Sequence, residues 1–207
     1  MPAATNSKRV KHTKELIRDA AMELLAEYGY KGTSVRKIAS KVGIRESALY
    51  NHYSNKEAIF LSITSKIFTT PFSHEDDQKI FYENAKKGKR FLQRFMTEFK
   101  LLSFDKNSEK LFRIMMIELM QNSSLRESFM KEFHEKNIKL LSGSFFIMMQ
   151  EGLIRSSDPM VMANEFLAPF FYLRLQISLL KADGASTTPL STQFEKHVDF
   201  FWESITI

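Results

Sequence analysis

Two short polar stretches, residues 34–36 and 45–56, carry side chains able to form specific hydrogen bonds with a large partner. Arginine matches the edge of guanine, asparagine matches that of adenine, and glutamate accepts from the amino group of cytosine. Residues of these types, with one serine among them, are Arg36, Arg45, Glu46, Ser47 and Asn51. Side chains suited to phosphate oxygens stand beside them at Ser34, Tyr50, His52 and Lys56. We therefore expect the first set to read the bases of duplex DNA and the second to hold the protein on its backbone.

Two features near these stretches leave alternatives open. Glu46 can accept from cytosine, or it can stabilise the N-terminus of a helix, where a carboxylate is favoured. Five basic side chains lie closer to the start of the chain: Lys8, Arg9, Lys11, His12 and Lys14. They form either an arm that follows the DNA backbone or minor groove, or a solvated tail without a partner.

The positive charge of the chain is concentrated in its first quarter. The 207 residues carry a net charge of +6, and residues 1–58 hold 11 lysines and arginines against 6 acidic residues, whereas residues 59–207 hold 19 against 18. A local basic surplus attracts a polyanion, and DNA phosphate is the commonest one. Charge alone leaves open a solvated basic surface without a partner.

Apolar residues recur at helical spacing along almost the whole chain, and no segment alternates with the two-residue period of a strand. The sequence therefore predicts an all-α fold. Near the N-terminus we expect helices over about 11–28, 35–42 and 45–53, with the pair Thr33 and Ser34 as the N-cap of the second and Gly43 at its end. Two short helices joined by a glycine turn form a helix-turn-helix, which sets its second helix in the major groove.

Further helices are expected along the rest of the chain. Ser54 and Glu57 form a capping box that should begin a fourth helix. Apolar periodicity then continues over about 80–104, 109–120 and 125–150.

The residues of the N-terminal region also resemble a known family. Four segments carry the resemblance: Gly32-Thr33-Ser34-Val35-Arg36-Lys37-Ile38-Ala39, Val42-Gly43-Ile44, Leu49-Tyr50-Asn51-His52-Tyr53 and Asn55-Lys56-Glu57. They are similar to the signature of TetR-type repressors. The resemblance implies a helix-turn-helix DNA-binding domain over 1–58 and a helical ligand-binding and dimerisation domain over 59–207, with about nine helices in all. It also implies the base and phosphate contacts given above and a small-molecule inducer.

The second region is rich in phenylalanine and methionine, which can line an adaptable apolar pocket for a hydrophobic or aromatic ligand. The candidate pocket residues are Phe91, Phe95, Phe99, Phe112, Met115, Met116, Phe145, Met149 and Phe170. The same stripes are typical of an ordinary core, so the alternative is that they only pack. Polar groups that can orient a ligand, or equally make surface or interhelical contacts, are Glu118, Asn137, Arg174 and Gln176.

The last two helices are expected to begin at Asp158-Pro159 and Thr188-Pro189. The first of them is apolar on several sides, and such a helix must be covered twice, which a two-fold four-helix interface does. The expected interface residues are Phe171, Arg174, Phe194, Val198, Phe201, Trp202 and Ile205. Burial within one subunit is the alternative.

Several functional classes fit the sequence poorly. The chain has no cysteine, which excludes disulfides and thiol nucleophiles, and its histidines at 12, 52, 74, 134 and 197 show no paired spacing for a metal. We therefore expect no metal, no cofactor and no enzymatic activity. The N-terminus lacks the apolar core of a signal peptide, and the apolar stretch 161–180 contains Glu165, Pro169, Arg174 and Gln176. We expect a cytoplasmic protein without a membrane span.

These expectations combine into one hypothesis. A homodimer binds a palindromic operator with its recognition helices roughly 34 to 36 Å apart, and a small hydrophobic or aromatic ligand releases it. The rival hypothesis is a DNA-binding protein without an inducer, whose second region only dimerises or docks a protein.

Overall fold

The computed structural model describes the backbone of residues 3–65, 67 and 75–207, and the side chains of 12–65, 67 and 79–207. The regular structure within these ranges is helical and contains no strand, which confirms the all-α prediction. The chain forms two compact units. The first unit contains Met1–Phe68 and Lys110–Glu127, and the second contains Thr69–Glu109 and Ser128–Ile207.

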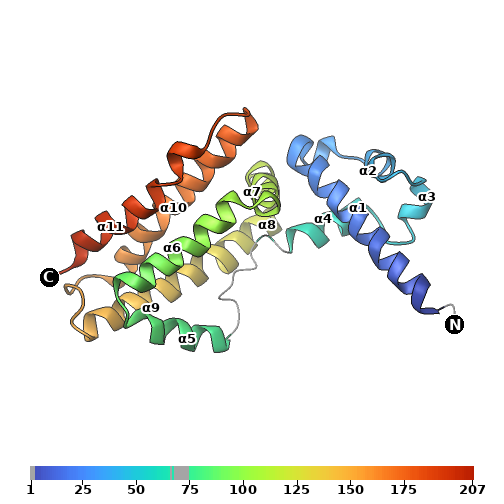
Figure 1. Ribbon diagram of the computed structural model, residues 1–207. Helices are drawn as coiled ribbons and strands as arrows, with labels where there is room; N and C mark the ends of the chain where they lie inside the picture. The colour runs from blue at the N-terminus through green and yellow to red at the C-terminus, as the bar shows by residue number, and fades with distance from the viewer. Residues whose placement is uncertain (1–2, 66, 68–74) are drawn as a thin grey trace. The chain divides into compact units, whose positions relative to one another are not determined.

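The first unit is built from α1 (Ala3–Gly32), α2 (Val35–Val42), α3 (Glu46–Leu49) and α4 (Lys56–Thr64) (Figure 1). It also includes most of α7 (Lys106–Glu118) and α8 (Ser123–Ser128). Its core holds one or more fully buried side chains from each of the four N-terminal helices and from α7: Ile17, Leu25, Ile38, Leu49, Ile59, Ile63 and Ile114. Ile114 explains why residues 110–127 pack in this unit, although the sequence analysis assigned them to the second domain. The proposed division at residue 58 stays a prediction.

Helix α1 is longer than the expected 11–28, because it begins at Ala3 and makes one more turn after a kink at Gly29. The kink residue has φ of 66° and ψ of −178°, which is a conformation that favours glycine. Residues 3–11 are therefore helical rather than an extended arm. The side chains of Lys8, Arg9 and Lys11 lie outside the described residues, so their contact with DNA stays a prediction.

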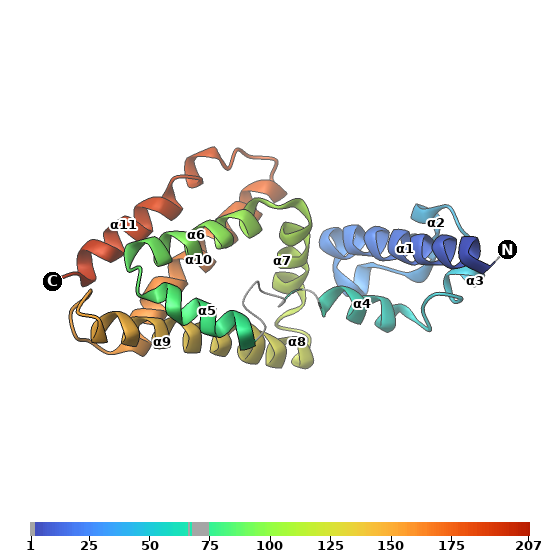
Figure 2. The same ribbon diagram turned by 60° about the horizontal axis from the view of Figure 1, so that its bottom comes forward.

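The second unit consists of α5 (Glu75–Ala85), α6 (Lys89–Phe104), the π-helix η1 (Phe129–Glu135), α9 (Lys136–Gln150), α10 (Pro159–Ala182), the 3₁₀ turn η2 (Thr188–Leu190) and α11 (Gln193–Ile205). Helix α10 packs against α9, α6 and α11, and α5 packs against α9 (Figure 2). The centre of this core is a group of fully buried phenylalanines: Phe145, Phe166, Phe170 and Phe194.

Three helical runs expected from periodicity are interrupted in the second unit. The run 80–104 breaks at Gly88, where φ is 55° and the ring of Trp202 packs so closely that a Cβ would come within 2.9 Å of it. The run 125–150 contains the π-helix η1, and the last helix begins at Gln193, after the 3₁₀ turn at Thr188–Leu190. Periodicity reports which residues face the core, and it does not register a local change in hydrogen-bond spacing.

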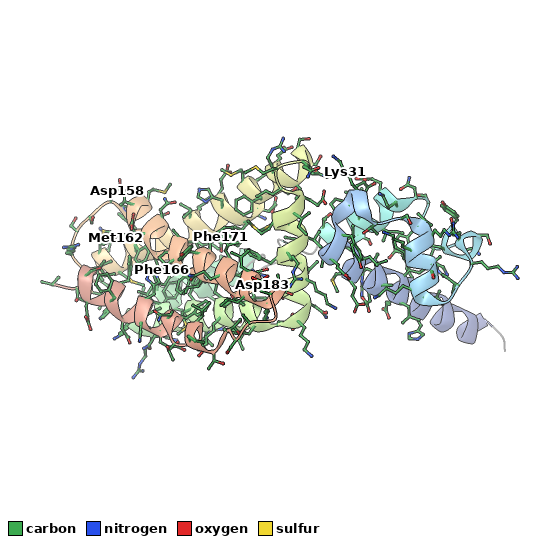
Figure 3. The ribbon with its side chains drawn as sticks, turned by 90° about the horizontal axis from the view of Figure 1, so that it is seen from above. Lys31, Asp158, Met162, Phe166, Phe171 and Asp183 are labelled. Atoms are coloured by element: carbon green, nitrogen blue, oxygen red, sulfur yellow. The ribbon has the colours of Figure 1, made fainter. Side chains whose placement is uncertain are left out.

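The ends of α10 are well defined, with Asp158 before its first turn and Asp183 after its last (Figure 3). The carboxylate of Asp158 accepts from the backbone N–H groups of Met160 at 2.8 Å and Val161 at 3.2 Å, which confirms the expected N-cap beside Pro159. No helix in the described part of the chain is long and apolar enough to cross a membrane.

His197 is enclosed by aromatic rings in the second unit, and this environment predicts a pH-dependent stability. Its Nε2 donates to the carbonyl of Phe166 at 2.9 Å, and its ring lies 4.9 Å from that of Phe170. Burial lowers the pKa of His197 below 6.5. Because the unfolded chain binds the proton more readily, this stability is present above pH about 6.5 and is lost as the pH falls. Urea unfolding from pH 7.5 to 5 should show the decline.

Two variants test whether His197 causes this decline. His197→Gln keeps a neutral donor and should flatten the pH dependence, whereas His12→Gln, which changes an exposed histidine, should leave it unchanged. An identical decline in His197→Gln and the parent protein would contradict the assignment.

Candidate functional site

Helix α2 is capped at both ends by residues that the sequence predicts. The hydroxyl of Ser34 accepts from the backbone N–H of Lys37 at 3.2 Å and closes the N-terminus of α2. Gly43 ends α2 in the left-handed conformation with φ of 78°, and the next N–H, that of Ile44, donates to the carbonyl of Ala39 at 3.0 Å. These bonds fix the direction in which the chain enters α3.

Helix α3 is shorter than the expected 45–53, since it spans only Glu46–Leu49. The chain nevertheless continues as a tight turn, in which Asn51 donates to the carbonyl of Ala48 at 3.3 Å and His52 donates to that of Leu49 at 2.9 Å. Bonds of this i→i+3 type are common where a helix tightens at its end. The next helix is capped by Asn55, which accepts from Ala58 at 2.8 Å, and not by the expected Ser54.

The predicted DNA-contacting residues divide cleanly from the core residues of the same helices. The exposed members of the set are Ser34, Arg36, Arg45, Glu46, Ser47, Tyr50 and Asn51. Leu49 and Ile38 lie on the opposite faces of α3 and α2. At most 1% of either residue is exposed to solvent. His52 is half-buried, and its Nδ1 has no hydrogen-bond partner among the described residues. The solvent-facing side of α2 and α3 is therefore polar, and the side that packs against the core is apolar.

Lys56 has an intramolecular role that the sequence analysis missed. Its Nζ donates to the carbonyls of Tyr30 at 2.8 Å and Thr33 at 3.0 Å, and it lies 3.9 Å from the centre of the Tyr30 ring. The ammonium group thereby ties the end of α1 to the start of α2. An ammonium has three donors, so one remains for a phosphate. The phosphate contact of Lys56 stays a prediction.

Glu118 supports the same turn from α7, within the first unit. Its buried carboxylate accepts from the backbone N–H of Tyr30 at 2.7 Å, directly after the kink at Gly29. A Cβ at position 29 would come within 3.0 Å of this carboxylate. Burial and a hydrogen bond to Glu57 raise the pKa of Tyr30 to about 12. Glu118 is therefore a structural partner of α1 and not a residue that orients a ligand in the second unit.

The nine residues expected to line a pocket are not brought together. Five belong to the buried core of the second unit: Phe91, Phe95, Phe99, Phe145 and Phe170. Met149 packs on the edge of this core, whereas Phe112, Met115 and Met116 belong to the first unit. These phenylalanines therefore pack in the core of the second unit, and their contact with a ligand stays a prediction.

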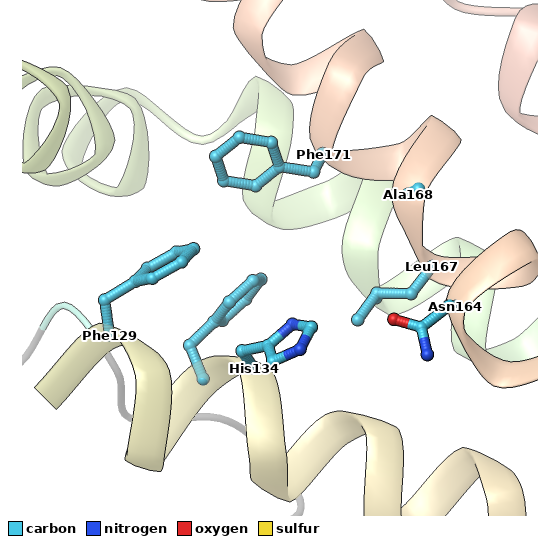
Figure 4. A pocket seen from close by; sticks show the side chains of 7 residues that line it. Phe129, His134, Asn164, Leu167, Ala168 and Phe171 are labelled. Carbon is cyan, nitrogen blue, oxygen red and sulfur yellow. The ribbon is translucent and has the colours of Figure 1, made fainter. Parts of the chain in front are cut away.

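A pocket of about 200 Å³ does lie in the second unit, between η1 and α10 (Figure 4). Its walls are formed by Phe129, Phe133 and His134 of η1 and by Asn164, Leu167, Ala168 and Phe171 of α10. None of the nine expected pocket residues contributes to it. The spacing of Phe129, Phe133 and His134 places them on one helical face, and that signal was available in the sequence.

Four of the residues expected at a dimer interface lie in the core of their own chain: Phe194, Val198, Phe201 and Ile205. Burial within one subunit explains their periodicity, which was the alternative considered. Trp202 is half-buried over Gly88, and Phe171 lines the pocket. Each of these six side chains is buried or half-buried within its own chain.

Arg174, also expected at the interface, is half-buried and donates to the carbonyl of Ser108 at 3.0 Å. Desolvation lowers its pKa to about 10, although the nearby carboxylate of Glu109 acts in the opposite direction. Glu109 in turn accepts from the hydroxyl of Ser178 at 3.2 Å. This polar network joins α10 to the chain around residue 108.

Comparison with protein families agrees with this architecture. Residues 17–63 match the model described as bacterial regulatory proteins of the tetR family. Residues 90–198, more than half of the chain, match the C-terminal domain of AefR-like transcriptional repressors. The chain belongs to the TetR family. TetR-family proteins are transcription regulators and not enzymes.

Individual relatives resemble this TetR-family protein over different lengths. The class D tetracycline repressor of Escherichia coli is 35% identical over 88 residues, which are 40% of this chain and 40% of that protein. The chain thus spans less than half the length of the tetracycline repressors that it matches. The fatty acid metabolism regulator protein of Bacillus subtilis (strain 168) is 29% identical over 153 residues, covering 73% of this chain and 75% of the relative.

Two solved structures show the same fold at low sequence identity. The SmeT–triclosan complex has a TM-score of 0.65 at 17% identity and covers 95% of this chain and 92% of its own. The regulator FadR from Bacillus subtilis, in complex with stearoyl-CoA, has a TM-score of 0.61 at 21% identity and covers 90% and 96%.

Proposed function

We propose that this TetR-family protein is a cytoplasmic repressor that binds a palindromic operator as a homodimer and is released by a small hydrophobic or aromatic ligand. The observation that carries the proposal is the arrangement of side chains on α2 and α3. The polar residues proposed to contact DNA are exposed there, and the apolar residues are buried. A basic first region adds the charge that DNA binding requires. Arg45, Ser47 and Asn51 are the residues proposed to read bases.

A second copy of the chain is proposed to pack on the outer face of α10. Val161, Ala168, Tyr172 and Leu179 are exposed and follow one another at intervals of 7, 4 and 7 residues. With about 3.6 residues per turn, these intervals keep all four on one face of the helix. We call this face the α10 stripe. It replaces the interface residues that the structure buries, because an apolar helical face of this length favours association.

Selection from a randomised duplex library tests the DNA-binding function. We expect enrichment of a palindrome with half-sites about one helical turn apart, bound more weakly as salt rises. Asn51→Ala should lose about 1–3 kcal/mol of discrimination at one base position, whereas Tyr50→Phe, which removes only a hydroxyl, should weaken all sequences equally. Fluorescence anisotropy on the enriched duplex measures both effects. Absence of any enriched site, or unchanged binding in both variants, would contradict the proposal.

A further inference from the structure

The pocket between η1 and α10 lies where both walls depart from regular α-helix. Residues Phe129–Glu135 form a π-helix, a rare conformation that widens the turn and is found frequently at functional sites. On the opposite wall, Pro169 lies inside α10 and cannot donate a backbone hydrogen bond to the preceding turn. The pocket therefore lies beside two positions where the regular helical hydrogen-bond pattern changes.

The apolar end of the pocket is built from three aromatic rings. The rings of Phe129 and Phe133 are stacked, with centroids 5.4 Å apart and planes at 25°. The ring of Phe171 faces them from α10, with its centroid 6.0 Å from that of Phe129 and its plane at 64° (Figure 4). Aromatic rings prefer offset-stacked and edge-to-face neighbours, and this arrangement offers both to an entering ring. Leu167 completes the apolar wall.

The other end of the pocket carries two polar side chains, His134 and Asn164, which approach from opposite walls (Figure 4). Asn164 donates one N–H to the carbonyl of Met160 at 2.9 Å, which leaves its Oδ1 free to accept. His134 makes no hydrogen bond or ion pair within the described part of the chain. The two side chains can therefore hold one hydroxyl, which donates to one of them and accepts from the other.

The size of the cavity limits the ligand. A dry cavity of roughly 150 Å³ is enough for benzene, whereas drug-sized ligands occupy roughly 300–1,000 Å³. A volume of about 200 Å³ therefore suits one ring or a fused pair and cannot enclose a long acyl chain. No lysine or arginine lines the pocket, so a carboxylate would meet no permanent positive charge there.

We propose that this pocket binds a neutral planar aromatic molecule that carries a hydroxyl, with its ring among Phe129, Phe133 and Phe171 and its hydroxyl between His134 and Asn164. The class is that of phenols and naphthols. This inference deepens the proposed function, since the bound molecule is then the ligand that releases DNA. Binding itself is measured without DNA and does not depend on that function.

The test uses the full-length protein and 2-naphthol as the probe, with isothermal titration calorimetry and thermal melting. We expect 2-naphthol to bind at one site per chain and to raise the melting temperature, because a ligand that binds only the folded state stabilises it. Phe171→Ala should weaken binding about tenfold or more. Phe146→Ala, which changes an exposed phenylalanine of α9 outside the pocket, should not. No binding of 2-naphthol, or equal losses in both variants, overturns the proposal.

Two further variants keep the test decisive if Phe171→Ala fails to fold. Asn164→Trp, at an exposed lining position outside the α10 stripe, fills the pocket and should abolish binding while melting normally. His134→Leu should remove the preference for 2-naphthol over naphthalene. Tighter binding of dodecanoate or 2-naphthoate than of 2-naphthol overturns the assigned class. If 2-naphthol binds as expected but leaves the DNA complex intact, the pocket is supported and the release function fails.

Discussion

Replacing Tyr172 and Leu179 together by glutamate is expected to convert the proposed dimer to a monomer and to lower operator affinity by roughly 10³-fold or more, toward the non-specific level. Both side chains are about 60% exposed on the α10 stripe, Tyr172 at 60% and Leu179 at 59%, so the chain itself does not need them for its core. Two pairs of like charges facing each other across a two-fold axis would repel and remain poorly solvated. Analytical ultracentrifugation measures the assembly, and fluorescence anisotropy measures the DNA affinity.

The control places the same change on another exposed leucine. Leu101 on α6 is 63% exposed and does not belong to the α10 stripe, so Leu101→Glu should leave both assembly and DNA binding near the parent values. Circular dichroism of the double variant should show an unchanged helical spectrum. A double variant that stays dimeric, or a Leu101→Glu variant that dissociates equally, would place the interface elsewhere.

Local features of the fold were predictable because their causes are local. Ser34, Gly43 and Asp158 act as caps in the structure as their types and neighbours indicate, since a cap needs only the backbone of the next turn. The exposure of Tyr50 and Asn51 followed from the position of Leu49, which occupies the buried face of the same turn. Such arguments require no knowledge of the tertiary fold.

Tertiary partners could not be predicted in this way. The sequence marks Lys56 as a cation, but its two carbonyl partners lie 23 and 26 positions away. Glu118 reaches Tyr30 across 88 positions, and no periodicity connects them. For the same reason Phe194 and Phe201 could be recognised as apolar, although the neighbour that covers them, their own chain or a second copy, could not.

The pocket illustrates a different limit. One of its walls is the π-helix at Phe129–Glu135, which the sequence does not show. A π-helix costs backbone regularity and persists only where the surrounding packing holds it. The rings of Phe129 and Phe133 pack on Phe171 across the cavity, and these contacts exist only in the folded unit. Apolar periodicity therefore pointed to the buried stripes and not to the cavity beside them.

Leu49→Ala is expected to remove about 2–5 kcal/mol of stability from the first unit and to abolish DNA binding with it. Leu49 is fully buried and is the only core residue that α3 contributes among the described side chains. A helix of four residues cannot persist without tertiary packing, so loss of this anchor should free the whole turn that carries Tyr50 and Asn51. Urea unfolding measures the stability, and hydrogen exchange of residues 45–53 measures the local opening.

The control variant replaces a second leucine of the same unit, one that lies outside the core. Leu61 on α4 is 53% exposed, and Leu61→Ala should change stability by less than about 0.5 kcal/mol and leave DNA binding intact. Leu49→Met, which nearly conserves volume, should cost less than about 1.5 kcal/mol and retain most of the DNA affinity. If Leu49→Ala loses stability but binds the operator as tightly as the parent, the DNA-contacting surface cannot be the segment that Leu49 anchors. The polar residues around Tyr50 would then be solvated surface, and the positive charge of the first unit would have to act through another face.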